Sequence, residues 1–215
     1  MRSRCKTAIL ISGSGTNLQA FIDAVSAGRL NLDLTVVCSN NANAFGLQRA
    51  KKAGIPTVCV RHTDFPDRES FDAAVIANLD RFAPDLLILA GFMRMLSPIF
   101  VARYAGKILN IHPALLPLYP GLNTHQRVIE AGDDWHGSTV HFVTEKLDGG
   151  PRILQGRLAV HRGESADELA ARVQAVEHQI YPEAAGWVGS GRVELRDGQT
   201  WMDSKLSDEP VKRTF

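Results

Sequence analysis

The fold is decided by the stretch Thr7-Ala8-Ile9-Leu10-Ile11-Ser12-Gly13-Ser14-Gly15-Thr16-Asn17. Its apolar first half has the length of a buried strand, and the glycines that follow end the strand in a turn. From Leu18 to Ala27 the apolar residues recur at helical spacing. The stretch therefore predicts a strand, a glycine-rich loop and a helix, in that order.

The rest of the first half repeats this alternation. Apolar runs at Leu32–Cys38, Thr57–Val60 and Asp85–Ala90 alternate with helical patterns at Ala44–Ala53 and Arg68–Phe82. Alternating strands and helices predict a parallel sheet that helices cover on both faces. The run Asp85–Ala90 is expected to be a central strand that ends at Gly91-Phe92-Met93, on the carboxyl edge where such folds bind ligands.

The second half begins with a short helix expected at Pro98–Tyr104 and a strand expected at Lys107–Ile111. That strand would bring His112 to the same carboxyl edge. The loop that follows is stiffened by Pro113, Pro117 and Pro120, because proline fixes φ and donates no hydrogen bond. Two further strands, antiparallel to each other, are expected at His136–Thr144 and Ile153–Val160, with Asp148-Gly149-Gly150 as a tight turn between them.

The C-terminal part is expected to add a long helix and a hairpin. Ser165-Ala166-Asp167-Glu168 forms a capping box, and the apolar stripe that follows consists of Leu169, Val173, Val176 and Ile180. Gln174, Glu177 and Tyr181 fall along one flank of that stripe. A hairpin is expected at Arg192–Trp201, and residues 203–215 are expected to be a frayed polar tail.

These elements predict an α/β fold, a Rossmann-like, doubly wound and mostly parallel sheet with a C-terminal antiparallel extension. We expect one domain over residues 1–202, with an N-terminal phosphate-binding half at 6–105 and a C-terminal catalytic half at 106–202. The chain of 215 residues is long enough for one such core.

Composition narrows the classes of partner. A formal net charge of +1, from 24 basic and 23 acidic residues, gives no broad attraction for nucleic acid or anionic membranes, so small molecules are the expected partners. The 3 cysteines follow no disulfide or metal-ligand spacing, which favours a reducing, cytoplasmic compartment. The first apolar run is too short for a signal peptide or a membrane span.

The loop Ser12-Gly13-Ser14-Gly15-Thr16-Asn17 suits an anion, because it precedes a helix whose first N–H groups and dipole favour negative charge. It is not a Walker loop, since no Gly-Lys-Ser/Thr follows, and Leu18 occupies the third glycine position of a dinucleotide fingerprint. A phosphate monoester is the expected ligand. The alternative is a glycine turn that serves chain geometry alone.

An amide, an imidazole and a carboxylate are expected at strand ends, from Asn110, His112 and Asp148. A carboxylate helps a histidine hold its proton, so His112 could offer a charged hydrogen bond to a developing oxyanion. Asn110 could add a second donor, and Asp148 could guide protons through a bound water. No Gly-x-Ser-x-Gly motif supplies a nucleophile, which favours direct acyl transfer. The alternative is that Asn110 caps a strand end, His112 donates to a loop carbonyl and Asp148 serves the Gly149-Gly150 turn.

A metal hydrolase is a second reading, because His112, His125, His136 and His141 lie in one third of the chain. However, there is no His-Glu-x-x-His motif, and His136 and His141 are expected on opposite faces of one strand. We therefore expect no metal.

The chain resembles the phosphoribosylglycinamide formyltransferase family, folate-dependent enzymes of purine synthesis. The resemblance covers roughly Ala8 to Trp201. It is carried by Ile11–Asn17, Ala44-Phe45-Gly46-Leu47, Leu89–Arg94, Leu109–Pro113, Leu115-Leu116-Pro117, His136–Val143 and Leu147–Pro151.

The resemblance implies the formyltransferase fold and a formyl donor, 10-formyltetrahydrofolate, that acts as co-substrate. It implies catalytic roles for Asn110, His112 and Asp148. It implies binding of the ribonucleotide by Gly15, Thr16, Asn17 and Glu177, and Gln174 on the same helix flank is added to this set. For the folate it implies Arg68, Met93, Arg94, Met95, Leu96, Asn110, Thr144, Glu145, Lys146, Leu147 and Asp148.

Three other functions are weighed. A formyltetrahydrofolate hydrolase and a methionyl-tRNA formyltransferase share the same chemistry but carry additional domains, so length and neutral charge disfavour them. A module that only senses a phosphorylated sugar would not need Asn110, His112 and Asp148. We expect a monomer or a homodimer that binds no nucleic acid and no membrane.

Overall fold

A computed structural model describes residues 4–215 and divides the chain into two compact units, the first ending at Leu109 and the second running from Asn110 to Phe215. Within residues 4–215, no helix has the length and apolar character needed to cross a membrane.

The first unit is built on parallel strands. They are β1 (Cys5–Ile11), β2 (Leu32–Ser39), β3 (Thr57–Cys59) and β4 (Leu86–Leu89), in the spatial order β4-β1-β2-β3. Ile9 of β1 pairs with Val37 on one side and Ile88 on the other, and all three are fully buried. Burial on both faces explains why these strands are continuous apolar runs in the sequence.

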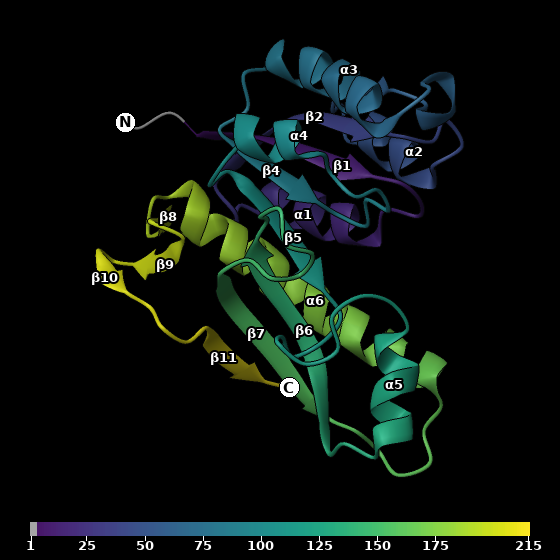
Figure 1. Cartoon of the computed structure of the whole chain (residues 1–215), viewed down its shortest axis with the longest axis vertical. Coiled ribbons are helices and arrows are strands. Elements are labelled where there is room, and N and C mark those ends of the chain that lie inside the picture. The colour runs from purple at the N-terminus through teal and green to yellow at the C-terminus, as the bar shows by residue number, and fades with distance from the viewer. Residues whose placement is uncertain (1–3) are drawn as a thin grey trace. The chain divides into compact units, whose positions relative to one another are not determined.

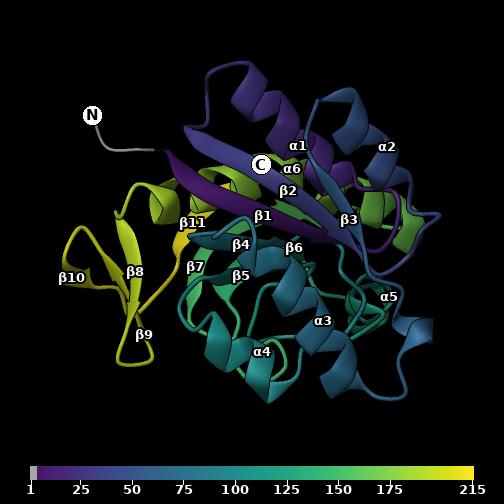
Figure 2. The same ribbon diagram turned by 90° about the horizontal axis from the view of Figure 1, so that it is seen from above.

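Helices cover both faces of this first sheet. Figure 2 shows α1 (Thr16–Ser26) and α2 (Phe45–Lys52) on one face, with α3 (Arg68–Asp80) and α4 (Pro98–Arg103) on the other. A single 3₁₀ turn, η1 (His62–Asp64), precedes α3. The predicted alternation of strands and helices is confirmed.

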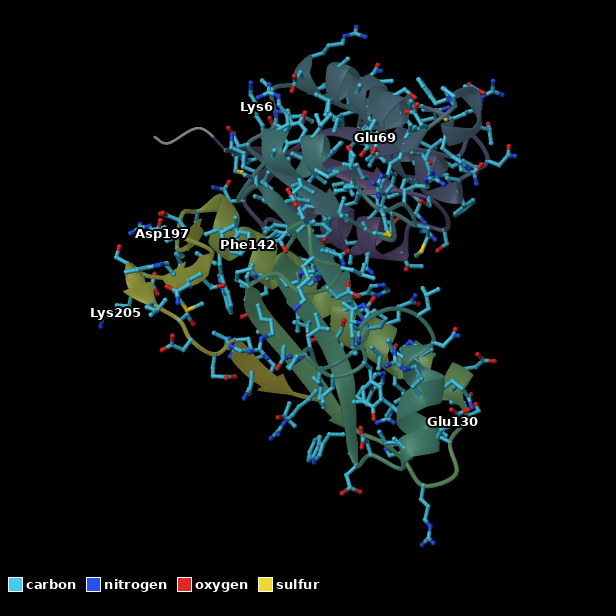
Figure 3. The ribbon with its side chains drawn as sticks, viewed as in Figure 1. Lys6, Glu69, Glu130, Phe142, Asp197 and Lys205 are labelled. Carbon is cyan, nitrogen blue, oxygen red and sulfur yellow. The ribbon has the colours of Figure 1, made fainter. Side chains whose placement is uncertain are left out.

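The second unit is built on antiparallel strands and one long helix. After β5 (Ile108–His112), strands β6 (Trp135–Phe142) and β7 (Arg152–Ala159) pair antiparallel, as the sequence predicts. In Figure 1, α6 (Ala166–Gly189) lies along these two strands. Phe142, labelled in Figure 3, is fully buried at the end of β6.

The start and the apolar stripe of α6 are both confirmed. Ser165 Oγ accepts the Glu168 N–H, and the Glu168 carboxylate accepts the Ser165 N–H at 2.8 Å, which is a complete capping box. Leu169, Val173, Val176 and Ile180 are all buried. The helix is therefore fixed by its cap at one end and by its apolar face along its length.

The predicted hairpin is present and is extended by one strand. It consists of β8 (Val193–Arg196) and β9 (Gln199–Met202), and β10 (Lys205–Leu206) adds to β9. A mostly parallel sheet with a smaller antiparallel sheet toward the C-terminus confirms the predicted fold class.

The prediction of a frayed tail at residues 203–215 is wrong. Besides β10, the segment contains β11 (Val211–Thr214), which pairs in parallel with β7 from Val211↔Leu154 to Thr214↔Arg157. The Phe215 N–H donates to the Arg157 carbonyl at 2.9 Å. Backbone hydrogen bonds to an edge strand need no apolar pattern, so composition gave no sign of this strand.

One helix of the second unit was not predicted. It is α5 (Thr124–Ala131), which follows the proline-rich loop. Only Thr124 and Val128 are buried in it, and Glu130 lies exposed on its outer side (Figure 3). A helix with so narrow an apolar face gives little periodicity for sequence reasoning to detect.

Candidate active site

The glycine loop of the first unit ends in an uncapped helix start. Gly15 is the N-cap of α1 with φ +70°, and it offers no side chain to accept the first N–H groups, which lack partners inside any helix. The first turn contains no acidic residue. The Arg49 side chain donates to the Ser14 carbonyl at 2.9 Å and adds positive charge to the loop. The loop therefore has the geometry and the charge that suit an anion.

Glycine is required at Gly15 for a second reason. A Cβ at this position would lie 2.7 Å from the Cα of Gly46, at the start of α2. The Gly46 N–H also donates to the Gly13 carbonyl at 3.1 Å. Gly46 thus helps to shape the loop, and only its place in a family motif, Ala44-Phe45-Gly46-Leu47, pointed to it.

A second loop of the first unit carries the residues expected to bind folate. Met93 and Met95 are 77% and 58% exposed, and the Met93 N–H donates to Ser12 Oγ at 2.8 Å. The loop ends at Ser97, whose N–H donates to the buried Asp72 carboxylate at 2.6 Å. Ser12 therefore joins this loop to the strand that enters the glycine loop.

The two arginines of the expected folate set lie on or beside α3. The Arg94 guanidinium lies 5.9 Å from the centre of the Phe71 ring. Arg68 is the first residue of α3, and its side chain is 39% exposed, 3.4 Å from the Glu69 carboxylate. Leu96 is partly buried.

The second unit brings Asn110, His112 and Asp148 together. His112 Nδ1 lies 3.4 Å from Asp148 Oδ2, and both side chains are only 7% exposed. Asn110 Nδ2 lies 3.3 Å from Nε2 of His141, and that same His141 atom is 3.9 Å from Asp148 Oδ1. The three predicted residues and His141 thus form one cluster, in which Asn110 is half-buried and the other three side chains are buried.

The ring orientation of His112 follows from its other partner. His112 Nε2 lies 2.8 Å from the Tyr119 carbonyl, and a carbonyl can only accept, so Nε2 carries a proton. Proton exchange on this imidazole is therefore confined to Nδ1, the nitrogen that faces Asp148. Charged His112 can donate from Nδ1 to the carboxylate.

His141 orients the Asn110 amide. Its Nδ1 donates to the Phe142 carbonyl at 2.8 Å, and burial lowers the pKa of His141, so at neutral pH its Nε2 is an acceptor. Asn110 therefore points its nitrogen toward His141 and has a second N–H besides that contact. Sequence reasoning gave His141 no role beyond a possible metal ligand, although it lies in the predicted strand.

Asp148 is held by its own loop and by a neighbouring one. Its φ is +48°, a left-handed conformation that aspartate tolerates better than most residues, and its Oδ2 accepts the Gly121 N–H at 2.9 Å. The residues before it in the expected folate loop, Glu145, Lys146 and Leu147, are exposed, and Thr144 is partly buried. A turn from the Lys146 carbonyl to the Gly149 N–H, 3.1 Å, closes the loop.

The two residues of α6 in the ribonucleotide set differ in burial. Glu177 is 8% exposed, and its Oε1 lies 3.0 Å from the Ser138 hydroxyl. The same hydroxyl donates to the His112 carbonyl at 2.7 Å. Gln174 is exposed. Glu177 is thus linked through Ser138 to the backbone of His112, whereas Gln174 is not.

The histidines do not assemble as metal ligands. His125 Nδ1 and His136 Nε2 lie 3.0 Å apart on α5 and β6, while His112 and His141 flank Asp148. Across residues 4–215, no group of three or more His, Cys, Asp or Glu side chains is arranged to hold a metal ion.

Residues 5–185 match the formyl transferase family. Phosphoribosylglycinamide formyltransferase of Escherichia coli is 50% identical over 92% of this chain and 93% of its own length, and that of Haemophilus influenzae is 48% identical over 93% and 94%. The structure of the Coxiella burnetii enzyme superposes with a TM-score of 0.93 at 44% identity, covering 97% of this chain and 99% of the other.

The fold and the similarity to known proteins show the class of protein: this is an enzyme, a transferase that moves formyl groups. The chain belongs to the formyl transferase family. The family resemblance stated from the sequence is confirmed.

Proposed function

We propose that this enzyme transfers the formyl group of 10-formyltetrahydrofolate to the amine of N1-(5-phospho-D-ribosyl)glycinamide, a step of purine biosynthesis. The observation that carries the proposal is the buried cluster of Asn110, His112 and Asp148 in a chain 50% identical to a phosphoribosylglycinamide formyltransferase.

The cluster suits direct attack of the amine on the formyl carbon. A bond forms between the amine nitrogen and that carbon, and the bond from the carbon to the folate nitrogen breaks. The second N–H of Asn110 and the charge of protonated His112 would stabilise the oxyanion of the tetrahedral intermediate. The amine loses one proton and the folate nitrogen gains one, and we assign this transfer to Asp148 together with His112 Nδ1, 3.4 Å apart.

Ligand-binding roles are proposed for the remaining residues. The uncapped start of α1 at Gly15, Thr16 and Asn17 would bind the phosphate, and Glu177 with Gln174 would bind the ribose. The folate would contact Arg68, the Met93–Leu96 loop with its exposed Met93 and Met95, Asn110 and the Thr144–Asp148 loop. No metal is required in this scheme, and the folate is consumed as a co-substrate.

The test is turnover. Purified protein given both substrates should release deformylated tetrahydrofolate and formylated ribonucleotide, and a metal chelator should not slow the reaction. Release of formate with water alone would identify a formyltetrahydrofolate hydrolase instead. Formylation of methionyl-tRNA would identify the third possibility. No turnover with any acceptor would refute the proposal.

We further propose that the enzyme works in the cytoplasm on small molecules, as a monomer or a homodimer, with the phosphate-binding and catalytic halves serving as one domain. The three cysteines, which follow no disulfide spacing, support the compartment, and the net charge of +1 supports small molecules as partners.

A further inference from the structure

A short loop segment, Tyr119–Gly121, contacts both titratable side chains of the cluster. The Tyr119 carbonyl accepts the proton of His112 Nε2 at 2.8 Å. Two residues later, the Gly121 N–H donates to Asp148 Oδ2 at 2.9 Å. A small shift of this segment would therefore change the hydrogen bonds of both His112 and Asp148 at once.

The backbone of this segment adopts a conformation that needs external support. Tyr119 has φ +52°, in the left-handed region, which costs a residue with a Cβ roughly 1–2 kcal/mol. Such a conformation persists only where surrounding contacts hold it. The carbonyl that accepts from His112 belongs to this strained residue, so the contacts that hold Tyr119 also determine where that carbonyl points.

Two side chains hold Tyr119 in place. The Tyr119 hydroxyl donates to Asp133 Oδ2 at 2.6 Å, and this hydrogen bond raises the pKa of Tyr119, so the hydroxyl keeps its proton at neutral pH. The Arg127 guanidinium lies 5.1 Å from the centre of the Tyr119 ring and donates to the Pro120 carbonyl at 2.8 Å. Arg127 is on α5, and Asp133 follows that helix.

We propose that Tyr119, Arg127 and Asp133 are positioning residues for catalysis, an inference that rests on the proposed function. Their contacts hold the Tyr119 carbonyl against His112 Nε2 and the Gly121 N–H against Asp148. Nδ1 is then the one ring nitrogen that exchanges a proton, and it faces the carboxylate that shares this role. The unpredicted helix α5 thus supports His112 and Asp148 through Arg127, and through Asp133, which follows the helix.

The first unit offers a matched control. There the Tyr104 hydroxyl donates to Asp80 Oδ1 at 2.8 Å, and the Arg103 guanidinium lies 5.6 Å from the Tyr104 ring and 2.9 Å from Asp80 Oδ2. As at Tyr119, a tyrosine hydroxyl donates to an aspartate and an arginine lies against the tyrosine ring. Tyr104→Phe and Tyr119→Phe each remove one hydroxyl that donates to a carboxylate, so differences between them reflect the role of the segment.

The experiment compares steady-state kinetics and thermal stability of Tyr119→Phe, Tyr104→Phe, Asp133→Ala and Asp133→Asn. Loss of one charged hydrogen bond predicts that Tyr119→Phe lowers kcat roughly 5–20-fold with little change in either KM. Asp133→Ala should match it. Asp133→Asn keeps an acceptor and should recover most of kcat, whereas Tyr104→Phe should lower Tm and leave kcat unchanged. Equal kcat in the two tyrosine variants would overturn the proposal.

A second measurement keeps this test separate from that of the proposed function. Nitrogen-15 NMR of the His112 ring reports which nitrogen carries the proton. The parent should show protonated Nε2, and Tyr119→Phe should weaken this preference, whatever substrate the enzyme uses. An unchanged His112 spectrum in Tyr119→Phe overturns the positioning role, whereas absence of turnover in the parent refutes only the proposed reaction.

Discussion

The glycine loop of the first unit and the cluster of Asn110, His112, His141 and Asp148 in the second are built in different ways. The loop uses backbone groups: a helix start at Gly15 with no side-chain cap, and a close approach to Gly46. The cluster uses buried and half-buried side chains that are oriented by partners far away in sequence, as His112 is by Asp148 and Asn110 by His141. A backbone site depends on chain geometry, whereas a side-chain site depends on its hydrogen-bond partners.

This difference decides how substitutions should act. A change in the cluster should remove the groups proposed to act in catalysis from a protein that still folds. A change in the loop should alter the backbone itself, so stability and ligand binding should fall together.

The largest effect is expected in the cluster. His112→Ala and Asp148→Asn should each lower kcat by roughly 10²-fold or more, the scale of losing one positioned acid, base or oxyanion donor. Because the glycine loop is untouched, the KM for the ribonucleotide should stay near that of the parent. Steady-state kinetics with both substrates measures this. Near-normal kcat in both variants would show that His112 and Asp148 have no role in catalysis.

A double variant sharpens this prediction. If His112 and Asp148 handle one proton together, the double variant should be little slower than the slower single variant, because residues that act as a unit are not additive. Fully multiplicative losses would mean that the two side chains act independently.

The loop and the cluster also differ in how far the sequence predicted them. The glycine loop and strands β1 to β4 follow from local patterns, namely apolar runs, glycines and helical spacing. The residues of the cluster and the pairing of His112 with Asp148 were predicted, but Tyr119 and His141, which orient His112 and Asn110, were not. His141 contacts Asn110 across 31 residues of sequence, and Tyr119 contacts His112 through a carbonyl whose direction depends on its φ of +52°. Neither contact is recorded by a local pattern of apolar residues.

The two elements that sequence reasoning missed have the same physical cause. Helix α5 buries only Thr124 and Val128, and strand β11 is held by backbone pairing with β7. Neither shows the periodic apolar side chains from which helices and strands are inferred. Each element can be recognised only from its contacts with a neighbouring element of the folded chain.

The second prediction tests the backbone site. Gly15 and Gly28 have nearly the same φ, +70° and +69°, but a Cβ at Gly28 meets nothing within 4 Å, whereas one at Gly15 would meet the Gly46 Cα at 2.7 Å. Gly28→Ala should therefore show only the cost of the left-handed conformation. Gly15→Ala should lose roughly 1–3 kcal/mol more, because of the steric overlap, and should raise the KM for the ribonucleotide.

Urea denaturation of the two variants gives the difference in free energy of unfolding directly. Equal destabilisation would show that the contact between Gly15 and Gly46 is not tight. A change in kcat with unchanged KM in Gly15→Ala would contradict a role of this loop in binding.

The smallest effect concerns pH and a buried histidine beside the cluster. Burial, helped by the nearby His125, lowers the pKa of His136 from 6.5 to about 4. The unfolded chain then binds a proton at His136 below about pH 6.5, while the folded protein does not until about pH 4. This contribution to stability is therefore present above pH 6.5 and is lost as the pH falls toward 4.

At pH 5.5 the expected loss from His136 is about 1 kcal/mol relative to pH 7.5. Urea denaturation of the parent and of His136→Asn gives the free energy of unfolding at both pH values. Between pH 7.5 and pH 5.5 this free energy should fall less in the variant than in the parent. His161→Asn, which removes an exposed histidine, is the control and should keep the parent's difference. His136 lies 3.0 Å from His125 of α5, so the same loss of stability should extend to α5, the helix whose Arg127 holds Tyr119. If His136→Asn and His161→Asn respond alike to pH, the buried pair does not set the acid stability of this unit.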